Sequence, residues 1–278
     1  MDPLASVYRH FSLSAQVYFC GKLCGLSSGH DTETAGHLHL SREGSIEVMQ
    51  ADKQSFRVRE PCVLFYPRPM QHRLQTDAEG AEIVCAHIDF GGGVLQPLLQ
   101  SLPSFMYLPL RSAGGLKHGV ELLFEEAFGA SPGRQAAVDR LAEYVLILLL
   151  RDAVGRELIQ SGTLLGLSDE RLSKALMAMH QHPERPWDLD RLADVAGMSR
   201  ARFAAHFREV VGVTPMAYLK AWRMAIVKTM LRRGEALKSI APAAGYESST
   251  ALSRIFTQST GQSPTEWMAS SRFEDQAP

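Results

Sequence analysis

The stretch LDRLADVAGMSRARFAAHFREVVGVTP at residues 189–215 is matched further along the chain by LKSIAPAAGYESSTALSRIFTQSTGQSP at residues 237–264. In each copy a short apolar pattern of helical period ends at a glycine, and a serine that can cap a second helix follows closely. Glycine suits this place because a position just beyond a helix often takes a left-handed backbone conformation. Two short helices joined by a tight turn predict a helix-turn-helix unit, which is present here twice.

The segment between the two copies, PMAYLKAWRMAIVKTMLRRG at residues 215–234, predicts one long helix. Tyr218, Trp222, Ile226 and Met230 recur every four residues, so an apolar stripe runs along an amphipathic rod. Such a rod would hold the two units at a fixed separation. The second helix of each unit could then enter the major groove on one face of a DNA duplex.

Charge is divided unequally along the 278 residues, although the net charge is only −1. Residues 188–269 carry 11 Lys and Arg against 7 Asp and Glu, whereas residues 1–187 carry 17 against 21. A basic module joined to an acidic one is expected where only one half of a protein meets phosphates. The length is sufficient for two domains.

Residues 1 to about 110 predict β-structure, because short β-prone runs alternate with turn signals. The runs are 17–19, 38–40, 46–49, 56–58, 63–66 and 83–90, and the turns include Arg42-Glu43-Gly44, Pro67-Arg68-Pro69 and Gly91-Gly92-Gly93. Many short strands at this spacing favour a sandwich or a small barrel.

Two helices are predicted to trail the β-structure, at residues 116–128 and 135–159. The second is apolar on most of its circumference, so it must be buried, either within its own domain or against a second copy of the chain. We expect a first domain at residues 1–160 and a linker at 161–168. A second, all-α domain is expected at 169–270, beginning with a helix at 169–180.

The doubled motif resembles the DNA-binding domain of the AraC/XylS family of bacterial transcription regulators. The resemblance rests on the two helix-turn-helix units with their joining helix, the GYES turn at 245–248, and the G-x-x-P ends at 212–215 and 261–264. The β-rich half resembles the cupin-like sensor domains that precede such DNA-binding domains. The resemblance implies a sequence-specific regulator, most often an activator. It also implies double-stranded DNA and RNA polymerase as partners, and a homodimer formed through the helix at 135–159.

The family's motif places candidate DNA-contacting residues on the second helix of each unit. They are Arg200, Ala201, Arg202, Ala204, Ala205 and Arg208 in the first unit, and Ser249, Thr250 and Arg254 in the second. Alanines can only touch thymine methyl groups, so base reading by the first unit would depend on Arg200 and Arg202, unless these two only hold phosphates. Thr257 and Gln258 stand where the resemblance implies basic residues, which predicts weaker binding by the second unit. Pro242 lies inside that unit's first helix, where it is tolerated if it lies near the helix start.

All four cysteines, Cys20, Cys24, Cys62 and Cys85, lie in the β-rich half. The contexts KLCG and VCAHIDF are similar to the two cysteine sites of the redox-responsive, RclR-like branch of the family. That resemblance implies sensing of oxidants or reactive chlorine through Cys24 and Cys85, with Cys20 as a further candidate, and closure of an oxidised thiol to a disulfide. The alternative is that all four are small buried core residues.

The histidines suggest a rival signal. His37, His39 and Glu43 form the pattern HxHxxxE, and with His72 they resemble the metal-binding pattern of cupin enzymes. Alternate residues of a strand share a face, and imidazoles with a carboxylate suit a divalent metal such as zinc, iron or copper. Glu43 precedes Gly44 in a predicted turn, however, which would aim its carboxylate away. A regulator that binds a metal or a small molecule in the cupin pocket therefore stays open beside ordinary buried or exposed histidines.

Two classes of function compete, a DNA-binding regulator and a cupin-type metalloenzyme with a helical appendage. The doubled motif and the charge asymmetry favour the regulator, and no nucleophile–base pattern or phosphate-binding glycine loop supports catalysis. The N-terminus lacks a basic start followed by an apolar run, and the most apolar stretch, 144–150, is far shorter than the ~20 residues of a membrane span. A cytoplasmic protein with reduced cysteines and no membrane partner is expected.

Overall fold

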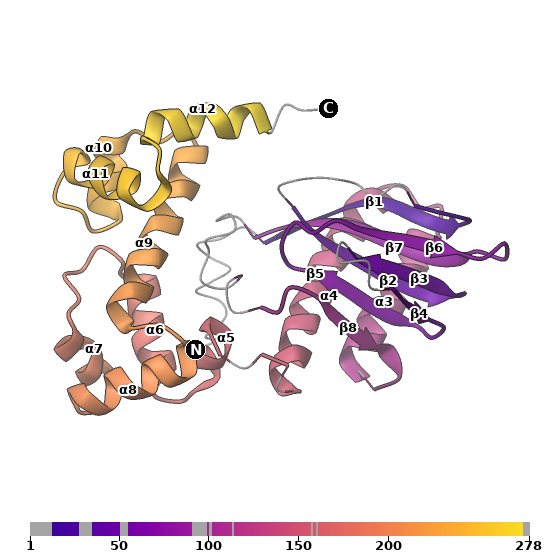
Figure 1. Cartoon of the computed structure of the whole chain (residues 1–278), viewed down its shortest axis with the longest axis horizontal. Helices are drawn as coiled ribbons and strands as arrows, with labels where there is room; N and C mark the ends of the chain where they lie inside the picture. Colours follow the sequence, from indigo (N-terminus) through magenta and orange to yellow (C-terminus); the bar gives the residue numbers. More distant parts are fainter. Residues whose placement is uncertain are drawn as a thin grey trace. The chain divides into compact units, whose positions relative to one another are not determined.

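The computed structural model describes residues 13–27, 35–50, 55–90, 99, 102–112, 114–156, 158–159 and 161–274. They form two compact units, each described by itself: a β-rich unit, residues 13–89 with 102–158, and a helical unit, residues 159–274 with residues 90 and 99. Figure 1 shows the strands and helices of both. The predicted fold class, a mainly β first half with trailing helices and an all-α second half, is confirmed. The predicted turn at Gly91-Gly92-Gly93 lies outside the described residues.

In the β-rich unit the described strands form an antiparallel five-stranded sheet of order β1-β7-β2-β5-β8 and a three-stranded sheet of order β4-β3-β6. The elements are β1 (Ser14–Leu23), β2 (Gly36–Glu43), β3 (Ile46–Gln50), β4 (Ser55–Val58), β5 (Cys62–Tyr66), β6 (His72–Thr76), β7 (Ala81–Asp89), β8 (Met106–Pro109), the 3-10 helix η1 (Leu110–Ser112), α3 (Gly114–Ala127) and α4 (Arg134–Gly155). The apolar core between the two sheets includes Ile46, Val48, Leu64, Leu74 and Ile83.

Two strands are absent from the sequence prediction. β6 reads HRLQT, and only its alternate residues Leu74 and Thr76 are buried. β8 has four residues and pairs along β5 at the edge of the larger sheet. β6 lacks an apolar run, whereas β8 is apolar but only four residues long, and each strand is paired along a neighbour in its sheet.

Helices α3 and α4 pack against the five-stranded sheet (Figure 1). The Val17 amide donates to Asp139 Oδ1 at 2.8 Å, and Gln135 Nε2 donates to the Val17 carbonyl at 3.0 Å, so α4 is hydrogen-bonded to β1. The Arg42 guanidinium lies 5.1 Å from the ring centre of Phe124 on α3. These contacts cover one face of the sheet and leave its other face for the second sheet. No helix among the described residues has the length and apolarity to cross a bilayer.

The helical unit contains both predicted helix-turn-helix motifs, α7–α8 and α10–α11. Its helices are α5 (Thr163–Ser168), α6 (Leu172–Gln181), α7 (Leu189–Ala196), α8 (Arg200–Val211), α9 (Pro215–Arg232), α10 (Leu237–Ala243), α11 (Ser249–Thr260) and α12 (Pro264–Glu274). Gly197 and Gly245 have φ values of 64° and 76°, as expected for left-handed turns. Ser248 Oγ accepts from the Ala251 amide at 3.1 Å, whereas Ser199 holds the capping position of α8 without a side-chain cap bond.

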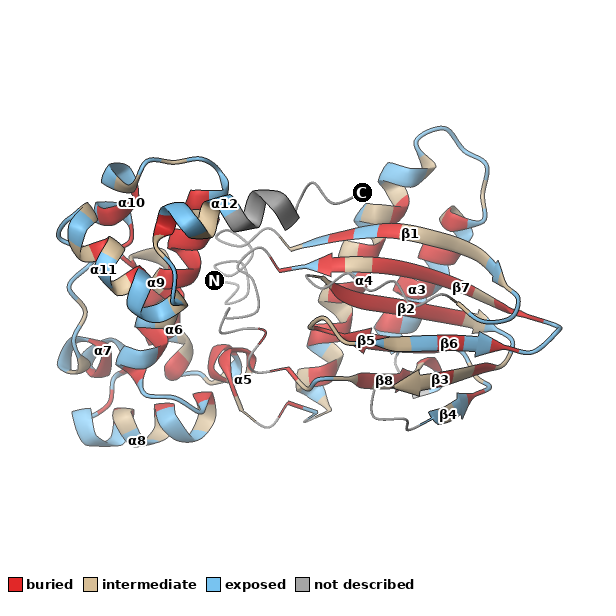
Figure 2. Cartoon of the chain, turned by 45° about the horizontal axis from the view of Figure 1, so that its top comes forward, coloured by how far each residue is buried: buried red, intermediate tan, exposed pale blue. Residues whose placement is uncertain are grey.

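The joining helix α9 differs from the predicted amphipathic rod, because 11 of its 18 residues are buried. Tyr218, Trp222 and Ile226 are buried as expected, and Val227 and Leu231 are buried as well. Figure 2 shows the buried turns of α9 between α7–α8 and α10–α11. The helix is therefore a core element shared by the two motifs, which hold their separation by packing and not by helix stiffness alone.

The segment predicted to be a linker, 161–168, instead contains helix α5, which packs against α6 and α8. Gly166 lies so close to Leu176 and Val211 that a Cβ atom there would come within 2.7 and 2.8 Å of their side chains. The Gly162 amide donates to the Val210 carbonyl at 2.9 Å. The small residues that suggest a linker are thus required by close helix packing.

Pro242 lies near the end of α10 and not near its start, since it is the sixth residue of the seven in Leu237–Ala243. The amide missing from Pro242 would have bonded the carbonyl four residues earlier, at Lys238. Because Pro242 is exposed, that carbonyl lies at the water-facing side of the helix, where a missing amide costs less than in the core.

Candidate functional site

The residues predicted to contact DNA lie on exposed faces of α8 and α11. Phe203 and Phe207 fix the orientation of α8 by burying its opposite face, and Leu252 and Phe256 do the same for α11. Figure 2 shows the outer face of α8 as exposed. Arg200, Ala201, Arg202, Ala205, Arg208, Thr250 and Arg254 are exposed, while Ala204 and Ser249 are half-buried. The geometry is compatible with entry of both helices into grooves, and the role of each residue stays a prediction.

Arg200 has an alternative partner in this structure. Its Nη1 atom lies 3.1 Å from Asp190 Oδ2 at the start of α7, and both side chains are about two-thirds exposed. To contact a guanine, Arg200 must exchange this carboxylate for the base. An exposed ion pair contributes only roughly 0–1 kcal/mol to stability, so its loss costs little free energy when Arg200 moves to a base.

The two recognition helices differ in charge. α8 carries Arg200, Arg202 and Arg208 against one carboxylate, Glu209, whereas Arg254 is the single charged residue of the sequence 249–260. Neutralisation of phosphates by Lys and Arg supplies much of the affinity for DNA. The lower positive charge of α11 therefore keeps the prediction that the second unit binds DNA more weakly than the first.

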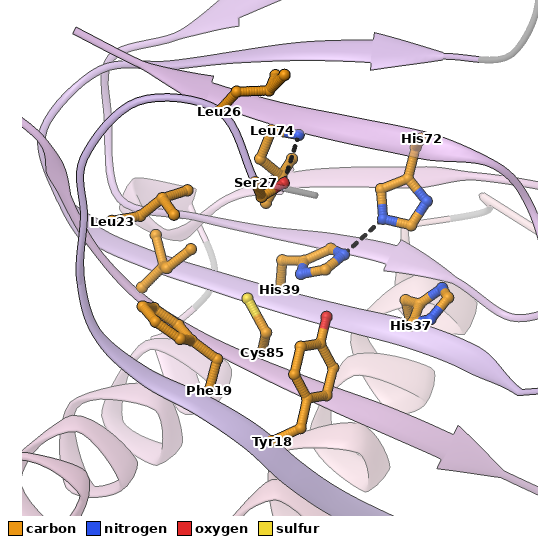
Figure 3. A pocket seen from close by; sticks show the side chains of 11 residues that line it. Tyr18, Phe19, Leu23, Leu26, Ser27, His37, His39, His72, Leu74 and Cys85 are labelled. Carbon is orange, nitrogen blue, oxygen red and sulfur yellow. Dashed lines mark hydrogen bonds between the residues drawn. The ribbon is translucent and has the colours of Figure 1, made fainter. Parts of the chain in front are cut away.

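A second candidate site is a cavity of about 220 Å³ between the two sheets of the β-rich unit. Apolar side chains occupy one part of its lining and histidines another, as Figure 3 shows. The lining residues are Tyr18, Phe19, Leu23, Leu26, Ser27, His37, His39, His72, Leu74, Ile83 and Cys85. They come from β1, β2, β6, β7 and the segment after β1, so the cavity is built by both sheets.

Two of the three histidines that line the cavity are hydrogen-bonded to each other. His39 Nε2 lies 2.7 Å from His72 Nε2, and His72 Nδ1 lies 2.8 Å from the Met70 carbonyl (Figure 3 shows the first contact). A carbonyl oxygen only accepts, so in neutral His72 the hydrogen is on Nδ1, and Nε2 accepts from His39. Burial lowers the pKa of His72, which favours this neutral form. The Tyr66 ring stacks on His72 with a centroid distance of 3.9 Å.

This arrangement does not fit the predicted metal centre. The structure does bring His37, His39 and His72 together, and it adds His87, whose ring centre lies 5.2 Å from that of His37. Glu43 ends β2, is exposed and does not line the cavity. The facing nitrogens of His39 and His72 are bonded to each other, and no group of three or more His, Cys, Asp or Glu side chains in the described part of the chain could hold a metal ion.

His87 and Tyr18 were not among the predicted site residues. The Tyr18 and His87 rings stack at 4.2 Å, next to the cavity that Tyr18 lines. A signal for His87 exists in the sequence: it follows Cys85 by two residues, and alternate residues of a strand share a face. Tyr18 lies at a register shift between Val17 and Phe19, a β-bulge that strand periodicity does not predict.

The cysteines are in contrasting environments. Cys85 is buried, its thiol and the Tyr18 hydroxyl are hydrogen-bonded, and burial raises the pKa of Cys85 to about 12. Burial also raises the pKa of Cys62 to about 12. Cys20 is half-buried, and Cys24 is exposed. Because the thiolate is the reactive form, Cys62 and Cys85 are poorly placed for oxidation and Cys24 is accessible.

The structure does not bring Cys24 and Cys85 together. Leu23 pairs with Ala81, and Cys24 lies beside Gly80, so Cys85 is four to five residues further along β7. At about 3.4 Å per residue this is a separation of more than ~13 Å, whereas disulfide-bonded Cα atoms lie within about 7 Å. The disulfide implied by the family resemblance would require rearrangement of β1. Cys20 pairs with Val84, the neighbour of Cys85, and so points to the opposite face of the sheet.

Known protein families match both halves of this chain. A family model described as cupin matches residues 2–155, and a helix-turn-helix domain model matches residues 192–270. The HTH-type transcriptional regulator AlkR of Acinetobacter baylyi is 34% identical, and the match covers 96% of this chain and 99% of AlkR. A putative AraC-like transcription regulator of Streptomyces lividans is 33% identical over 64% of this chain and 60% of its own length. This chain belongs to the AraC family of transcription regulators.

Other matches include one further regulator and two solved structures. The RCS-specific HTH-type transcriptional activator RclR of Escherichia coli is 29% identical, with 82% of each chain covered. Among solved structures, ToxT of Vibrio cholerae matches with a TM-score of 0.41 at 11% identity, over 92% of this chain and 97% of ToxT. The DNA-binding domain of AdpA in complex with a target DNA matches with a TM-score of 0.36 at 27% identity, over 39% of this chain and 99% of that domain. The identity to AlkR and the helix-turn-helix domain model over residues 192–270 make this chain an AraC-family DNA-binding regulator.

Proposed function

We propose that this AraC-family regulator controls transcription in response to a small molecule bound in the cavity between the sheets of its β-rich unit. The observation that carries the proposal is the cavity itself, which combines an apolar wall with polar groups held in place by hydrogen bonds. Its volume of about 220 Å³ is below the ~300–1,000 Å³ of pockets for drug-sized ligands. The ligand is therefore compact.

The lining indicates the chemistry of the ligand. Phe19, Leu74 and Ile83 would exclude water from an apolar body, while His39 and the Tyr18 hydroxyl offer hydrogen bonds to one polar group. The lining residues that the structure describes include no Lys or Arg that could pair with a full negative charge, and an unpaired buried charge is costly. We infer a neutral, mostly apolar molecule with one polar group.

Ligand binding can be tested by thermal unfolding of the full chain. The probe is a panel of neutral alcohols, ketones and phenols of about ten non-hydrogen atoms. A saturating binder stabilises the folded state, and at ~100 times its Kd the unfolding temperature is expected to rise by roughly 5–10 °C. Ile83→Trp, which fills the cavity, is expected to abolish the rise, and the control Leu158→Trp, at an exposed position of the β-rich unit, to leave it unchanged. If no member of the panel shifts the wild-type transition, the ligand proposal is wrong.

A second candidate signal is an oxidant, reactive chlorine in particular, that acts on Cys24. The support is the exposure of Cys24 and the similarity to RclR, which is named as RCS-specific. Hypochlorous acid would transfer chlorine to the Cys24 thiolate with release of hydroxide, and hydrolysis of the sulfur–chlorine bond would give a sulfenic acid and chloride. In the same experiment, with hypochlorous acid in place of the panel, a shift that Cys24→Ser removes and Cys85→Ser keeps would favour this candidate.

We also infer that the regulator is an activator that contacts RNA polymerase, and that it works as a homodimer. The similarity to RclR, which is named as an activator, supports activation. Support for the dimer comes from exposed apolar side chains on the two trailing helices: Tyr144 on α4 is 45% exposed and Leu122 on α3 is 42% exposed. Gly119, one turn before Leu122, lies against Tyr144, so the two helices share this apolar surface.

The dimer can be tested by light scattering. Tyr144→Arg is expected to shift the mass of the full chain from two copies to one, because it places a charge in an apolar interface. Leu158→Arg, at another exposed apolar residue of the β-rich unit, is the matched control and is expected to leave the mass unchanged. A monomeric wild-type chain at micromolar concentration would contradict the dimer.

A further inference from the structure

The two helix-turn-helix motifs are joined by a second connection besides the length of α9. Arg223, near the middle of α9, reaches the loop between α6 and α7. Its Nε atom donates to the Pro183 carbonyl at 2.7 Å, and its Nη2 atom donates to the Arg185 carbonyl at 2.7 Å. The same loop is closed on itself by Trp187 Nε1, which donates to the His182 carbonyl at 2.8 Å. Arg223 therefore holds the segment from which the first motif begins.

The other side of this contact is the turn of the second motif. A Cβ atom added to Gly245 would lie 2.7 Å from the Pro183 carbonyl oxygen and 2.8 Å from Arg223 Cζ. The turn between α10 and α11 thus packs with its backbone directly on the loop and on the guanidinium. The next residue, Tyr246, packs against the apolar core of the second motif. Any displacement of Gly245 therefore moves that core as well.

We propose that Arg223 and Gly245 form a positioning site that fixes the separation and rotation of the two recognition helices, so that the regulator accepts two half-sites at one spacing only. The proposal rests on the DNA-binding assignment and is independent of the signal that the β-rich unit receives. Arg223 itself makes no contact with DNA in this proposal. It affects base recognition only by setting the positions of α8 and α11.

The geometry of DNA explains why such a site would matter. Half-sites on one face of B-DNA repeat every 10–10.5 base pairs, about 34–36 Å, so an inserted base pair rotates one half-site by roughly 35° about the duplex. The 18 residues of α9 span roughly 27 Å at 1.5 Å per residue. A rigid protein of this length engages both half-sites only when rotation and distance agree. With the contact broken, each motif can adjust separately, at the cost of a lower effective concentration of the second.

The experiment is selection of binding sites from a random duplex library by the full chain, followed by affinity measurements. The wild type is expected to select two motifs at one separation. Arg223→Gln is expected to retain both motifs but to spread their separation over one or two base pairs. On the duplex of wild-type spacing its affinity is expected to fall about tenfold. One inserted base pair is expected to weaken the wild type more than about tenfold and Arg223→Gln less than about threefold.

Three further variants separate positioning from folding and from charge. Arg233→Gln removes the same charge next to the exposed end of α9 and is expected to keep the wild-type separation. Arg223→Lys keeps the charge but cannot place two planar donors on two carbonyls, so an intermediate spread is expected. Gly245→Ala strains a left-handed position and drives a Cβ atom into the contact, so it should spread the separation without a change in charge. Should Arg223→Gln fail to fold, Arg223→Lys and Gly245→Ala carry the test.

Two results would overturn the proposal. The first is a folded Arg223→Gln, or folded Arg223→Lys and Gly245→Ala, that selects the same single separation with wild-type affinity. The second is a wild-type chain that selects one motif only, because there is then no separation for the contact to fix. A weaker base preference within each selected motif, with the spacing between the motifs unchanged, would indicate a general structural role for Arg223. That result would also contradict the proposal.

Discussion

Replacing Trp222 with alanine is expected to lower the free energy of unfolding of the helical unit by roughly 3–5 kcal/mol and to abolish DNA binding. Trp222 is fully buried in α9, and its ring stacks on His180 of α6 with a centroid distance of 3.6 Å and an interplanar angle of 17°. His180 in turn bonds the Tyr218 hydroxyl at 2.7 Å, so truncation leaves a cavity beside a buried polar pair. The expected loss is a large part of the ~5–15 kcal/mol that stabilises a domain.

Tryptophan fluorescence in a urea titration is the measurement, because all three tryptophans of the chain lie in the helical unit. Trp187 and Trp267 remain as reporters in the variant. The matched control is Met216→Ala, at a 42% exposed position in the first turn of α9, which is expected to change the free energy of unfolding by less than about 0.5 kcal/mol. Equal urea midpoints for Trp222→Ala and Met216→Ala would show that α9 is not the shared core.

Alanine in place of Arg202 is expected to weaken binding to the selected duplex by roughly 10–100-fold, which corresponds to ~1–3 kcal/mol for one bidentate contact to guanine. Arg202 is exposed in the first turn of α8. Arg200→Ala is expected to have a smaller effect, because Arg200 first has to leave Asp190. The double variant is expected to lose more than either single variant.

Fluorescence anisotropy at several salt concentrations distinguishes base reading from phosphate binding. If Arg202 reads guanine, substitution of that base pair weakens the wild type and leaves Arg202→Ala unaffected. Loss of a phosphate contact instead weakens binding on all sequences alike and lowers the salt slope by about one. Arg57→Ala, which removes an exposed arginine from the β-rich unit, controls for net charge and is expected to bind as the wild type does.

The helical unit is the part that the sequence predicts best, because its signals are local. Gly197 and Gly245 mark turns that need a left-handed backbone, and the buried phenylalanines of α8 recur at helical spacing. The burial of α9 on most of its circumference could not be predicted from one apolar stripe, since it depends on both motifs packing against it. The small residues at 161–168 predict a linker, whereas Gly166 of α5 serves close contacts with Leu176 and Val211, which are distant in sequence.

The candidate site in the β-rich unit depends on sheet register, which the sequence alone does not supply. Alternation on one strand predicts His37 and His39 on one face, the cupin resemblance adds His72 from another strand, and all three side chains line the cavity. The direct His39–His72 bond and the separation of Cys24 from Cys85 follow from how β1, β2, β6 and β7 pair. Without that pairing, neither the poor fit to a metal nor the distance between the thiols could be predicted.

The start of the helical unit has a mechanical consequence. The Gly162 amide is bonded to the Val210 carbonyl, and Gly166 packs against Val211, so the incoming chain is attached to the last turn of the first recognition helix. A pull or twist on the backbone at Ile159 therefore acts on the end of α8 through two adjacent attachment points. The entry of the chain into the helical unit and the end of the helix that carries Arg200 and Arg202 are thus coupled, through one backbone hydrogen bond and one close packing contact.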